Sequence, residues 1–376
     1  MYQKQTMKTM HHLLFIALVL LSGCGNKPGT GNEPPTVDIT WQFYPESITL
    51  TSGGSTQNLT VTSNGTWSVT SSQTWCTTSP TVGYNGQTSL KITAMNNSAE
   101  AERTAVLTFK SGTYTKQFTV KQAAGTIQNY VPAGYTLKWQ DEFNDARQTN
   151  GKTPLPSTTR WWYETGAGGW GNNEIQNYIS AYRGTDTCAV ISDGILKIIA
   201  KKVGTEVLSV RMNSTDSWTY GYFEARLKMP TGKGTWPAFW MMPKNFTNWP
   251  LDGEIDIMEY VGYDPNVVHA SVHTMAYYHT IGTQKTATKT ILNAETDFHI
   301  YAMEWTADKI DGYVDGVKYF TFNNDKTNNK NTWPFNAPFY LKLNLAWGGN
   351  WGGAQGIDAT KLPAVYEIDY VRVYQK

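Results

Sequence analysis

Three carboxylates lie within six residues of the segment GEIDIMEY, at Glu254, Asp256 and Glu259. Such a group can perform general acid and base chemistry, because closely spaced carboxylates do not all stay charged and at least one pKa must rise. Two carboxyl groups about 5 to 5.5 Å apart fit a glycosidase that retains the anomeric configuration. Calcium binding and an acidic, solvated strand are the alternatives that this segment alone leaves open.

The spacing of these acids predicts the local geometry of their strand. Side chains two residues apart share one face of a strand, so Glu254 and Asp256 point the same way. In a regular strand Glu259 would point to the opposite face, where a lone carboxylate among hydrophobic side chains is costly. A β-bulge near Ile257 and Met258 absorbs one residue and returns Glu259 to the shared face. We therefore predict a bulged strand with three acids on one side.

The acids belong to the second of two expected β domains. Residues 39–124 contain short Thr- and Val-rich runs with period-two alternation, separated by Gly and Asn turns, which predicts a small β-sandwich. Residues 125–134 form the expected linker. Residues 135–376 hold 12 of the 15 Trp and are dominated by strand patterns, which favours one large sandwich or jelly roll. The expected fold class is all-β.

The N-terminus predicts export and a lipid anchor. Residues 1–23 contain the apolar run LLFIALVLL, which has nine residues and is too short to span a bilayer, so we interpret it as part of a signal peptide. The following LSGC resembles a bacterial lipobox, in which Cys24 becomes the acylated N-terminus. Residues 24–38 are the expected tether, and the protein is expected on the periplasmic or cell-surface face of an outer membrane. An ordinary secretory signal is the alternative.

The composition limits the class of partner. A formal net charge of +1 with 16% charged residues argues against nucleic acid, which attracts a basic surface. The 15 Trp and 22 Tyr suit a neutral ligand held between aromatic faces, and we expect a monomer. Cys76 and Cys188 fall in different expected domains, so we predict two small buried residues rather than a disulfide.

The segment around the acids resembles a known enzyme family. GTWPAFWMMP upstream and SVHTMAYYH downstream, together with GEIDIMEY, resemble the catalytic region of glycoside hydrolase family 16, the laminarinases and β-glucanases. The resemblance covers roughly residues 135–376 and implies a concanavalin-like jelly roll. It implies Glu254 as nucleophile, Glu259 as acid/base and Asp256 as the residue that positions and tunes the pair.

The first expected domain resembles a different family. NGTWSVTSSQTWCTTSP and the later FTVKQAAG resemble the BACON domain, an immunoglobulin-like module common at the N-terminus of Bacteroidetes polysaccharide enzymes. The resemblance leaves glycan binding open, and a spacer role is the one we expect. Trp67 and Trp75 are expected in the core of this domain rather than on a sugar-binding surface.

Further segments of the second domain resemble the cleft of the hydrolase family. They are WGNNEIQNY, WPAFW, HTMA and LNLAWGGNWGG, although Gly352 stands where many laminarinases have Pro. For Trp240 the core and the cleft are equal alternatives, and His273 is expected to tune Glu259 by a hydrogen bond. Zinc binding by the nearby histidines fits no common ligand spacing. The resemblance implies these substrate-binding residues: Asn173, Glu174, Trp236, Trp240, His273, Trp347, Asn350 and Trp351.

The resemblance implies a retaining endo-β-glucanase that hydrolyses β-1,3-glucans or mixed β-1,3/1,4-glucans without a catalytic cofactor. A structural calcium ion is expected at Asp369 and at backbone near Glu142. The expected partners are the polysaccharide and, through the N-terminal lipid, a membrane. A hydrolase of a galactan such as agarose or porphyran is one alternative, and a non-catalytic glycan-binding lipoprotein is another.

Overall fold

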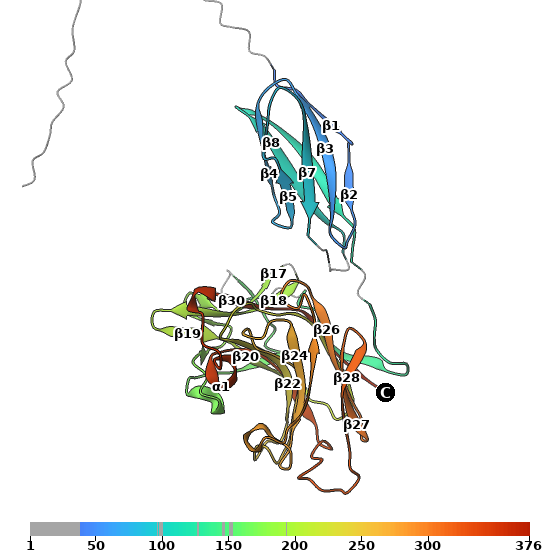
Figure 1. Ribbon diagram of the computed structural model, residues 1–376, viewed down its shortest axis with the longest axis vertical. Coiled ribbons are helices and arrows are strands. Elements are labelled where there is room, and N and C mark those ends of the chain that lie inside the picture. Colours follow the sequence, from blue (N-terminus) through green and yellow to red (C-terminus); the bar gives the residue numbers. More distant parts are fainter. Residues whose placement is uncertain are drawn as a thin grey trace, which may run out of the picture. The chain divides into compact units, whose positions relative to one another are not determined.

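The computed structural model describes residues 38–95, 97, 101–125, 128–144, 147–149, 153–192 and 194–376, which divide into two compact units (Figure 1). Strands dominate both units, so the expected all-β class is confirmed. Within this part of the chain, no helix is long and apolar enough to cross a membrane. The expected signal peptide, the expected lipidation site Cys24 and the expected tether up to residue 37 lie outside the described residues.

The first unit is a sandwich of two sheets. Its four-stranded sheet has the order β1 (Trp41–Tyr44), β3 (Ser55–Ser63), β7 (Gly86–Ala94), β5 (Cys76–Ser79). Its five-stranded sheet has the order β2 (Ile48–Leu50), β9 (Tyr114–Gln122), β8 (Arg103–Ser111), β4 (Trp67–Ser71), β6 (Val82–Gly83).

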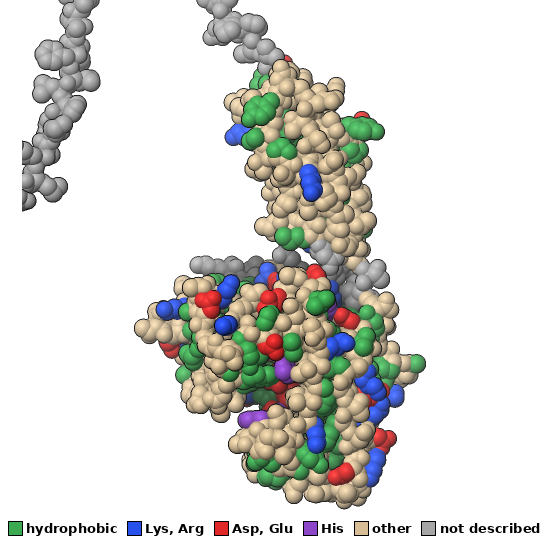
Figure 2. Space-filling model, in the orientation of Figure 1, with side chains coloured by type: hydrophobic (Ala, Val, Ile, Leu, Met, Phe, Trp, Pro, Cys, Tyr) green, Lys and Arg blue, Asp and Glu red, His purple; other side chains and the backbone are tan. Residues whose placement is uncertain are grey.

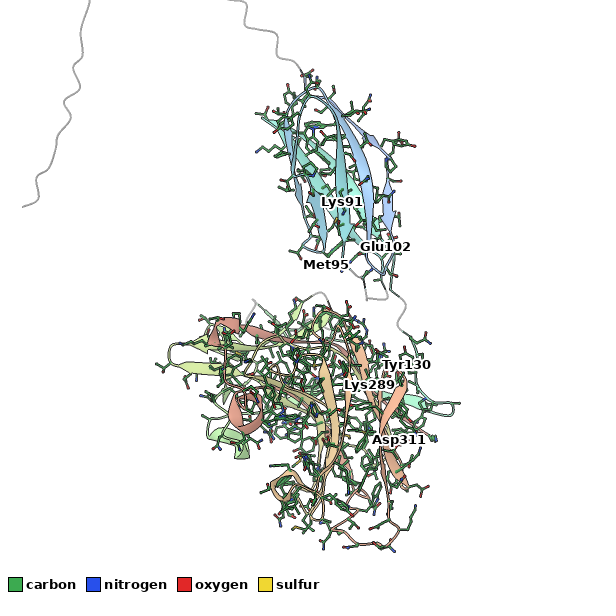
Figure 3. The ribbon with its side chains drawn as sticks, in the orientation of Figure 1. Lys91, Met95, Glu102, Tyr130, Lys289 and Asp311 are labelled. Carbon is green, nitrogen blue, oxygen red and sulfur yellow. The ribbon has the colours of Figure 1, made fainter. Side chains whose placement is uncertain are left out.

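The core of this unit follows from strict alternation along its strands. On β7, Leu90 and Ile92 are buried, whereas Lys91 between them, labelled in Figure 3, is exposed. Trp67 is buried as expected, and its indole occupies the space above Gly83, where a Cβ atom would lie 2.2 Å from the ring. Trp75 is only half-buried, because its position in a turn before β5 places it at the margin of the core.

The second unit is a larger sandwich, the expected jelly roll. Its outer sheet has ten strands: β10 (Thr136–Asp141), β14 (Asn177–Tyr178), β17 (Ala189–Ser192), β18 (Ile195–Val203), β19 (Glu206–Ser209), β21 (Gly221–Lys228), β26 (His299–Trp305), β27 (Lys309–Val314), β28 (Val317–Asn323) and β30 (Ala364–Gln375). The opposing sheet has seven, in the order β13 (Trp161–Glu164), β20 (Arg211–Ser214), β29 (Phe339–Trp347), β22 (Thr235–Pro243), β23 (Glu254–Tyr260), β24 (Val267–His273), β25 (Lys285–Thr290).

Short elements complete this unit. They are the hairpins β11 (Arg147–Thr149) with β12 (Thr153–Leu155) and β15 (Tyr182–Arg183) with β16 (Asp186–Thr187), the 3-10 turns Gly169–Gly171, His279–Ile281 and Ala359–Lys361, and the single-turn helix α1 (Gly349–Gly352).

One hydrophobic core lies between the two large sheets. It includes Phe239 and Met241 from β22, Ile255 from β23 and Leu343 from β29. Side chains alternate along each strand, so the residues next to these core residues in the sequence face away from the core. The outward face of the seven-stranded sheet carries the expected site. Cys188 in this unit and Cys76 in the first are both buried, as expected.

The exact domain limits stay predictions. The strands show that β1 begins at Trp41, that β9 ends at Gln122 and that β10 begins at Thr136. These bounds fall inside the expected domains 39–124 and 135–376, and the interval between β9 and β10 contains the expected linker at 125–134.

Candidate active site

The strand that carries the three acids is bulged where the spacing predicts it. On β22, the three residues from Ala238 to Trp240 pair with four residues of β23, Asp256 to Glu259. The pairing of β23 with β24 shifts between the same two acids. Ile257 and Met258 both join the hydrophobic core, so burial of two consecutive apolar side chains accounts for the extra residue. The predicted bulge is confirmed.

Glu254 lies at one end of the group, beneath a tryptophan. The indole Nε1 of Trp249 donates a hydrogen bond of 3.1 Å to Glu254 Oε2. Burial and the nearby charge of Asp256 raise the pKa of Glu254 above its ordinary value. His273 and Arg211 oppose this increase because their positive charges favour the ionised carboxylate.

Glu259 lies at the other end, beside a second tryptophan. The indole Nε1 of Trp236 donates a hydrogen bond of 3.2 Å to Glu259 Oε1. Burial, Asp256 and Glu254 together raise the pKa of Glu259 well above its ordinary value, and His273 opposes them. The charge of Arg211, which lines the same cavity, additionally favours the ionised form of Glu254.

His273 lies at the Glu254 end of the group. The strand register places His273 opposite Glu254 and His269 opposite Glu259. The Nε2 atom of His273 is 3.3 Å from Asp256 Oδ2 and 3.9 Å from Glu254 Oε1. The structure thus pairs His273 with Asp256, in place of the expected hydrogen bond to Glu259. Burial opposes protonation of this ring, but the contact with Asp256 prevails and raises the pKa of His273 to about 9.

The same histidine belongs to a cluster that could hold a metal ion. Among the described residues, Glu254, Asp256 and His273 form this cluster, with ligand atoms within 4.8 Å of one another. A metal-binding histidine must be neutral. A cation would therefore have to compete with the proton on His273, whose pKa the contact with Asp256 raises to about 9.

The acids open into a cavity of about 470 Å³ with aromatic walls. Figure 2 shows acidic and histidine side chains within a hollow of the second unit that is bordered by hydrophobic ones. Three expected substrate-binding residues line the cavity: Glu174, Trp236 and Trp240. The lining also includes residues that the sequence analysis missed, chiefly Glu164, Trp170, Arg211, Trp249, Tyr340, Lys342 and Asn344.

Trp240 belongs to the cleft wall rather than to the core. It alternates with the core residues Phe239 and Met241 on β22, so its half-buried ring faces the cavity. The indole Nε1 donates a hydrogen bond of 2.7 Å to Asn344 Oδ1. The guanidinium of Arg211 lies 4.8 Å from the ring centroid and fixes the ring further.

A buried ionic cluster lies beneath this wall. Lys342 Nζ is 2.7 Å from Glu164 Oε2, and Arg211 Nε is 2.6 Å from the same oxygen. Burial and the charge of Arg211 lower the pKa of Lys342 to about 7, although Glu164 acts in the opposite direction. The signal for this cluster was the alternation in FYLKLNLAW, where Lys342 and Asn344 are the polar residues between buried leucines.

Two loops form the rim of the cleft on the Glu174 side. Asn173 Nδ2 donates a hydrogen bond of 2.8 Å to Asn350 Oδ1, and both side chains are exposed. Glu174 and Gly348 form an isolated β-bridge between the same loops. Trp351 packs edge-on against Trp236 with ring centroids 5.4 Å apart. Asn173, Asn350 and Trp351 therefore lie beside the cavity that Glu174 and Trp236 line, and they are not part of its lining.

The prediction for Trp347 is wrong. Its side chain is only 2% exposed and belongs to the hydrophobic core. The reason is the parity of β29, where Leu343, Leu345 and Trp347 face the core while Asn344 and Ala346 face the cavity.

The expected calcium residues are occupied by ion pairs. Asp369 Oδ2 accepts a hydrogen bond of 2.7 Å from Arg226, and Glu142 accepts two from Arg372. Burial raises the pKa of Asp369, although Arg226 opposes this. A calcium ion bound by Asp369 would share this carboxylate with Arg226, whereas the ion pair of the Glu142 side chain does not involve the backbone that the expected site uses. Calcium binding there stays a prediction.

Paired glutamates on one face of a bulged strand, set in an aromatic cleft on a β-sandwich, define the class of this protein as a glycoside hydrolase. The chain belongs to the glycosyl hydrolases family 16, which matches residues 175–372. Residues 65–123 match the BACON family, described as a putative N-terminal binding domain.

Relatives of known name agree with this assignment. The chain is similar to a beta-glucanase of Rhodothermus marinus, with 43% identity over 254 residues that cover 64% of this chain and 85% of the relative. The laminarinase structure from Rhodothermus marinus superposes with a TM-score of 0.59 at 42% identity, covering 64% of this chain and 97% of that one. SCLam, a non-specific endo-beta-1,3(4)-glucanase, gives a TM-score of 0.60 at 42% identity, covering 65% of this chain and 93% of its own.

Proposed function

We propose that this protein is a retaining endo-β-glucanase that hydrolyses β-1,3-glucans, mixed β-1,3/1,4-glucans or both. The observation that carries the proposal is the placement of Glu254, Asp256 and Glu259 on one face of a bulged strand, in the lining of an aromatic cavity. The substrate class is supported by the names of the relatives, a beta-glucanase, a laminarinase and a non-specific endo-beta-1,3(4)-glucanase.

The surroundings of the two glutamates assign the two roles. Glu254, whose ionised form Arg211 and His273 favour, attacks the anomeric carbon and displaces the departing sugar. Glu259, whose protonated form burial and the neighbouring carboxylates favour, protonates the oxygen of the leaving group. After departure, the ionised Glu259 takes a proton from water, and that water hydrolyses the glycosyl-enzyme with a second inversion.

Asp256 and His273 position the nucleophile. Asp256 is buried between the two glutamates and lies 3.3 Å from the imidazole Nε2 of His273. The resulting ion pair offsets part of the negative charge of the group, so Glu254 can ionise beside Asp256. Hydrolysis in this family needs no catalytic cofactor.

The aromatic lining supports a neutral polymer. Trp236, Trp240 and Trp249 offer ring faces or edges to the cavity that holds the acids. Sugar rings present apolar C–H faces, so aromatic side chains bind them without charge. A galactan substrate is the alternative within the same mechanism.

The place of the protein in the cell is a separate proposal. Acylation of Cys24 would anchor a monomeric enzyme to the outer membrane through a Gly-, Pro- and Asn-containing tether. Expression of the full-length chain followed by mass spectrometry of the membrane-bound protein tests this proposal. A Cys24→Ser variant is expected in the soluble fraction, and an unlipidated wild-type N-terminus would contradict the anchor.

Digestion of several polysaccharides side by side tests the proposed activity. Laminarin, barley β-glucan, lichenan, agarose and porphyran are incubated with the protein, and chromatography resolves the product lengths. We expect short oligosaccharides from laminarin or barley glucan, with the β-anomer appearing first in the proton NMR spectrum. Activity confined to a galactan would overturn the substrate, and binding without hydrolysis would support the glycan-binding alternative.

A further inference from the structure

A second aromatic surface continues the cleft face beyond the cavity. The strand registers place Trp162, Asn213, Lys342, Trp240 and Asp256 in one row across β13, β20, β29, β22 and β23. Neighbouring strands are about 4.8 Å apart, so Trp162 lies about 19 Å from Asp256 along this row. The row leads from the acids to the edge strand on the side of the sheet that carries Glu164 and Arg211.

Trp162 faces the same side of the sheet as the acids. On β13 it alternates with Trp161, which is in the core, and it shares its face with Glu164, which lines the cavity. Its side chain is 42% exposed, whereas Trp161 is only 1% exposed. A large indole left in solvent on the cleft face of the sheet is a feature that packing of the core does not explain.

The exposed ring is held in place by its neighbours. Its Nε1 donates a hydrogen bond of 3.2 Å to the carbonyl oxygen of Ser214. Its centroid is 5.9 Å from that of Tyr340, at an interplanar angle of 50°. Tyr340 in turn lines the catalytic cavity, and Lys342 Nζ lies 5.1 Å from its ring centroid. Trp162 and Tyr340 thus form a rigid aromatic surface that is continuous with the cavity.

The surroundings of this surface favour an uncharged ligand. Lys342 lies in the row, Arg211 lies opposite Glu164 on β20, and both cations are paired with Glu164. The side chain of Lys342 is 1% exposed and therefore does not present its charge to a ligand. A sugar ring without sulfate or carboxylate groups can stack on the two aromatic rings and leave this ion-paired cluster intact.

We propose that Trp162 and Tyr340 form a distal subsite for a sugar unit of the same neutral polysaccharide chain that is cleaved between Glu254 and Glu259. The inference rests on the proposed function, since it assumes that a glucan chain occupies the cavity. It adds a preference for long substrates, because a chain must extend about 19 Å from the acids to reach Trp162. A short oligosaccharide fills the cavity without making this contact.

A Trp162→Ala variant tests the subsite with two substrates. One is laminarin or barley β-glucan, whichever the wild type cleaves, and the other is an aryl glycoside of a disaccharide of the same linkage, too short to reach β13. Loss of the stacking surface is expected to raise KM for the polymer about three- to tenfold. The kcat on the polymer and both constants for the short substrate are expected to stay within twofold of the wild type.

Two further variants serve as controls. Trp162→Phe keeps an aromatic ring and is expected to restore most of the polymer affinity. Tyr182→Ala removes an aromatic side chain of similar exposure, 40%, that does not line the cavity, and should leave both substrates unchanged.

Three results would overturn the subsite. One is an unchanged KM for the polymer in Trp162→Ala, and another is an equal rise for both substrates, which would indicate a local change in structure. Failure of the wild type to cleave any glucan would overturn the proposed function and the subsite together, and it is distinguishable because it precedes any comparison of variants.

Discussion

The two sandwiches use the outward faces of their sheets differently. On β7 of the first unit, buried and exposed residues alternate, and the outward Lys91 lies in solvent. On β23 of the second unit, the outward residues are the three acids, yet Asp256 is only 2% exposed. The indoles of Trp249 and Trp236 hydrogen-bond to the two glutamates of this face. Burial of the face raises the pKa values of Glu254 and Glu259.

Ion pairs show the same contrast. Lys121 and Glu102 of the first unit form a surface pair with side chains 53% and 49% exposed. Lys342 and Glu164 of the second unit form a pair with side chains 1% and 24% exposed. Water and ions screen exposed ion pairs, so such pairs contribute little to stability and have little electrostatic effect on neighbouring groups. The buried pair fixes the position of a cleft wall.

The largest expected effect is a loss of kcat when carboxylates of the second unit are replaced, with no loss when a carboxylate of the first unit is replaced. Glu254→Gln is expected to lower kcat on the glucan by about 10⁴-fold or more, because no nucleophile remains. Glu259→Gln should lower it by about 10²- to 10⁴-fold on an unactivated polymer. Glu102→Gln, on the exposed face of the first unit, should leave kcat unchanged. Substantial turnover by either active-site variant would contradict the roles assigned to these residues.

The next largest effect is a loss of stability, which compares the hydrophobic cores of the two units. Trp67→Ala and Trp161→Ala each remove a fully packed indole and should lower the unfolding free energy of their own unit by about 3–5 kcal/mol. Trp161 also donates a hydrogen bond of 2.8 Å to the buried Asp141. Scanning calorimetry and hydrolysis assays are expected to show that Trp67→Ala keeps its activity at 25 °C. A parallel loss of activity in Trp67→Ala would show that catalysis depends on the first sandwich.

A pH dependence of stability between about pH 6.5 and 9 is expected from His273 in the second unit. The pKa of His273 rises from 6.5 in the unfolded chain to about 9 in the fold, so the native state binds more protons between these values. Stability from this group is full below pH 6.5 and is lost as the pH rises through 9, by about 3 kcal/mol. Denaturant titrations of His273→Gln should show a flatter curve over this interval than the wild type.

The first unit supplies an internal control for that experiment. Residues 38–125 contain no histidine, so the unfolding of this unit should not show the same dependence between pH 6.5 and 9. Identical curves for wild type and His273→Gln would mean that Asp256 does not hold the imidazole in its protonated form.

The smallest effect compares the two ends of the acidic group. The indoles of Trp249 and Trp236 donate hydrogen bonds to Glu254 and Glu259, and both lower the pKa of their acceptor. Trp249→Phe should therefore raise the pKa of Glu254 and shift the acid limb of the kcat/KM profile upward by about one pH unit. Trp236→Phe should shift the basic limb upward by a similar amount. A shift of both limbs in either variant would contradict separate roles.

The features that depend on short-range sequence could be predicted. The bulge follows from the spacing of acids and apolar residues within one octapeptide, and the core position of Trp67 follows from alternation within one strand. Both depend on the period of the strand and the cost of burying charge, which a local segment is sufficient to reveal.

The features that depend on pairing between distant strands could not be predicted from the sequence. Lys342 reaches Glu164 only because β29 and β13 both pair with β20, and this register is not present in any local pattern. The position of His273 opposite Glu254 depends on the turn between β23 and β24 in the same way. Trp347 resembles a cleft residue of the family, but the alternation of side chains along β29 places it in the core with Leu343 and Leu345.

The link between the two rim loops has a consequence for attempts to alter specificity by loop exchange. The loop of Asn173 and the loop of Asn350 are joined by a side-chain hydrogen bond, by the bridge between Glu174 and Gly348, and by a backbone hydrogen bond of 2.7 Å from Asn350 to Asn172. A loop transplanted alone from a related enzyme would lose its partner and leave buried backbone groups unpaired. The two loops therefore have to be exchanged together. A chimaera that receives both loops should keep the hydrogen bonds between them and the form of the cleft, whereas a chimaera that receives one loop should not.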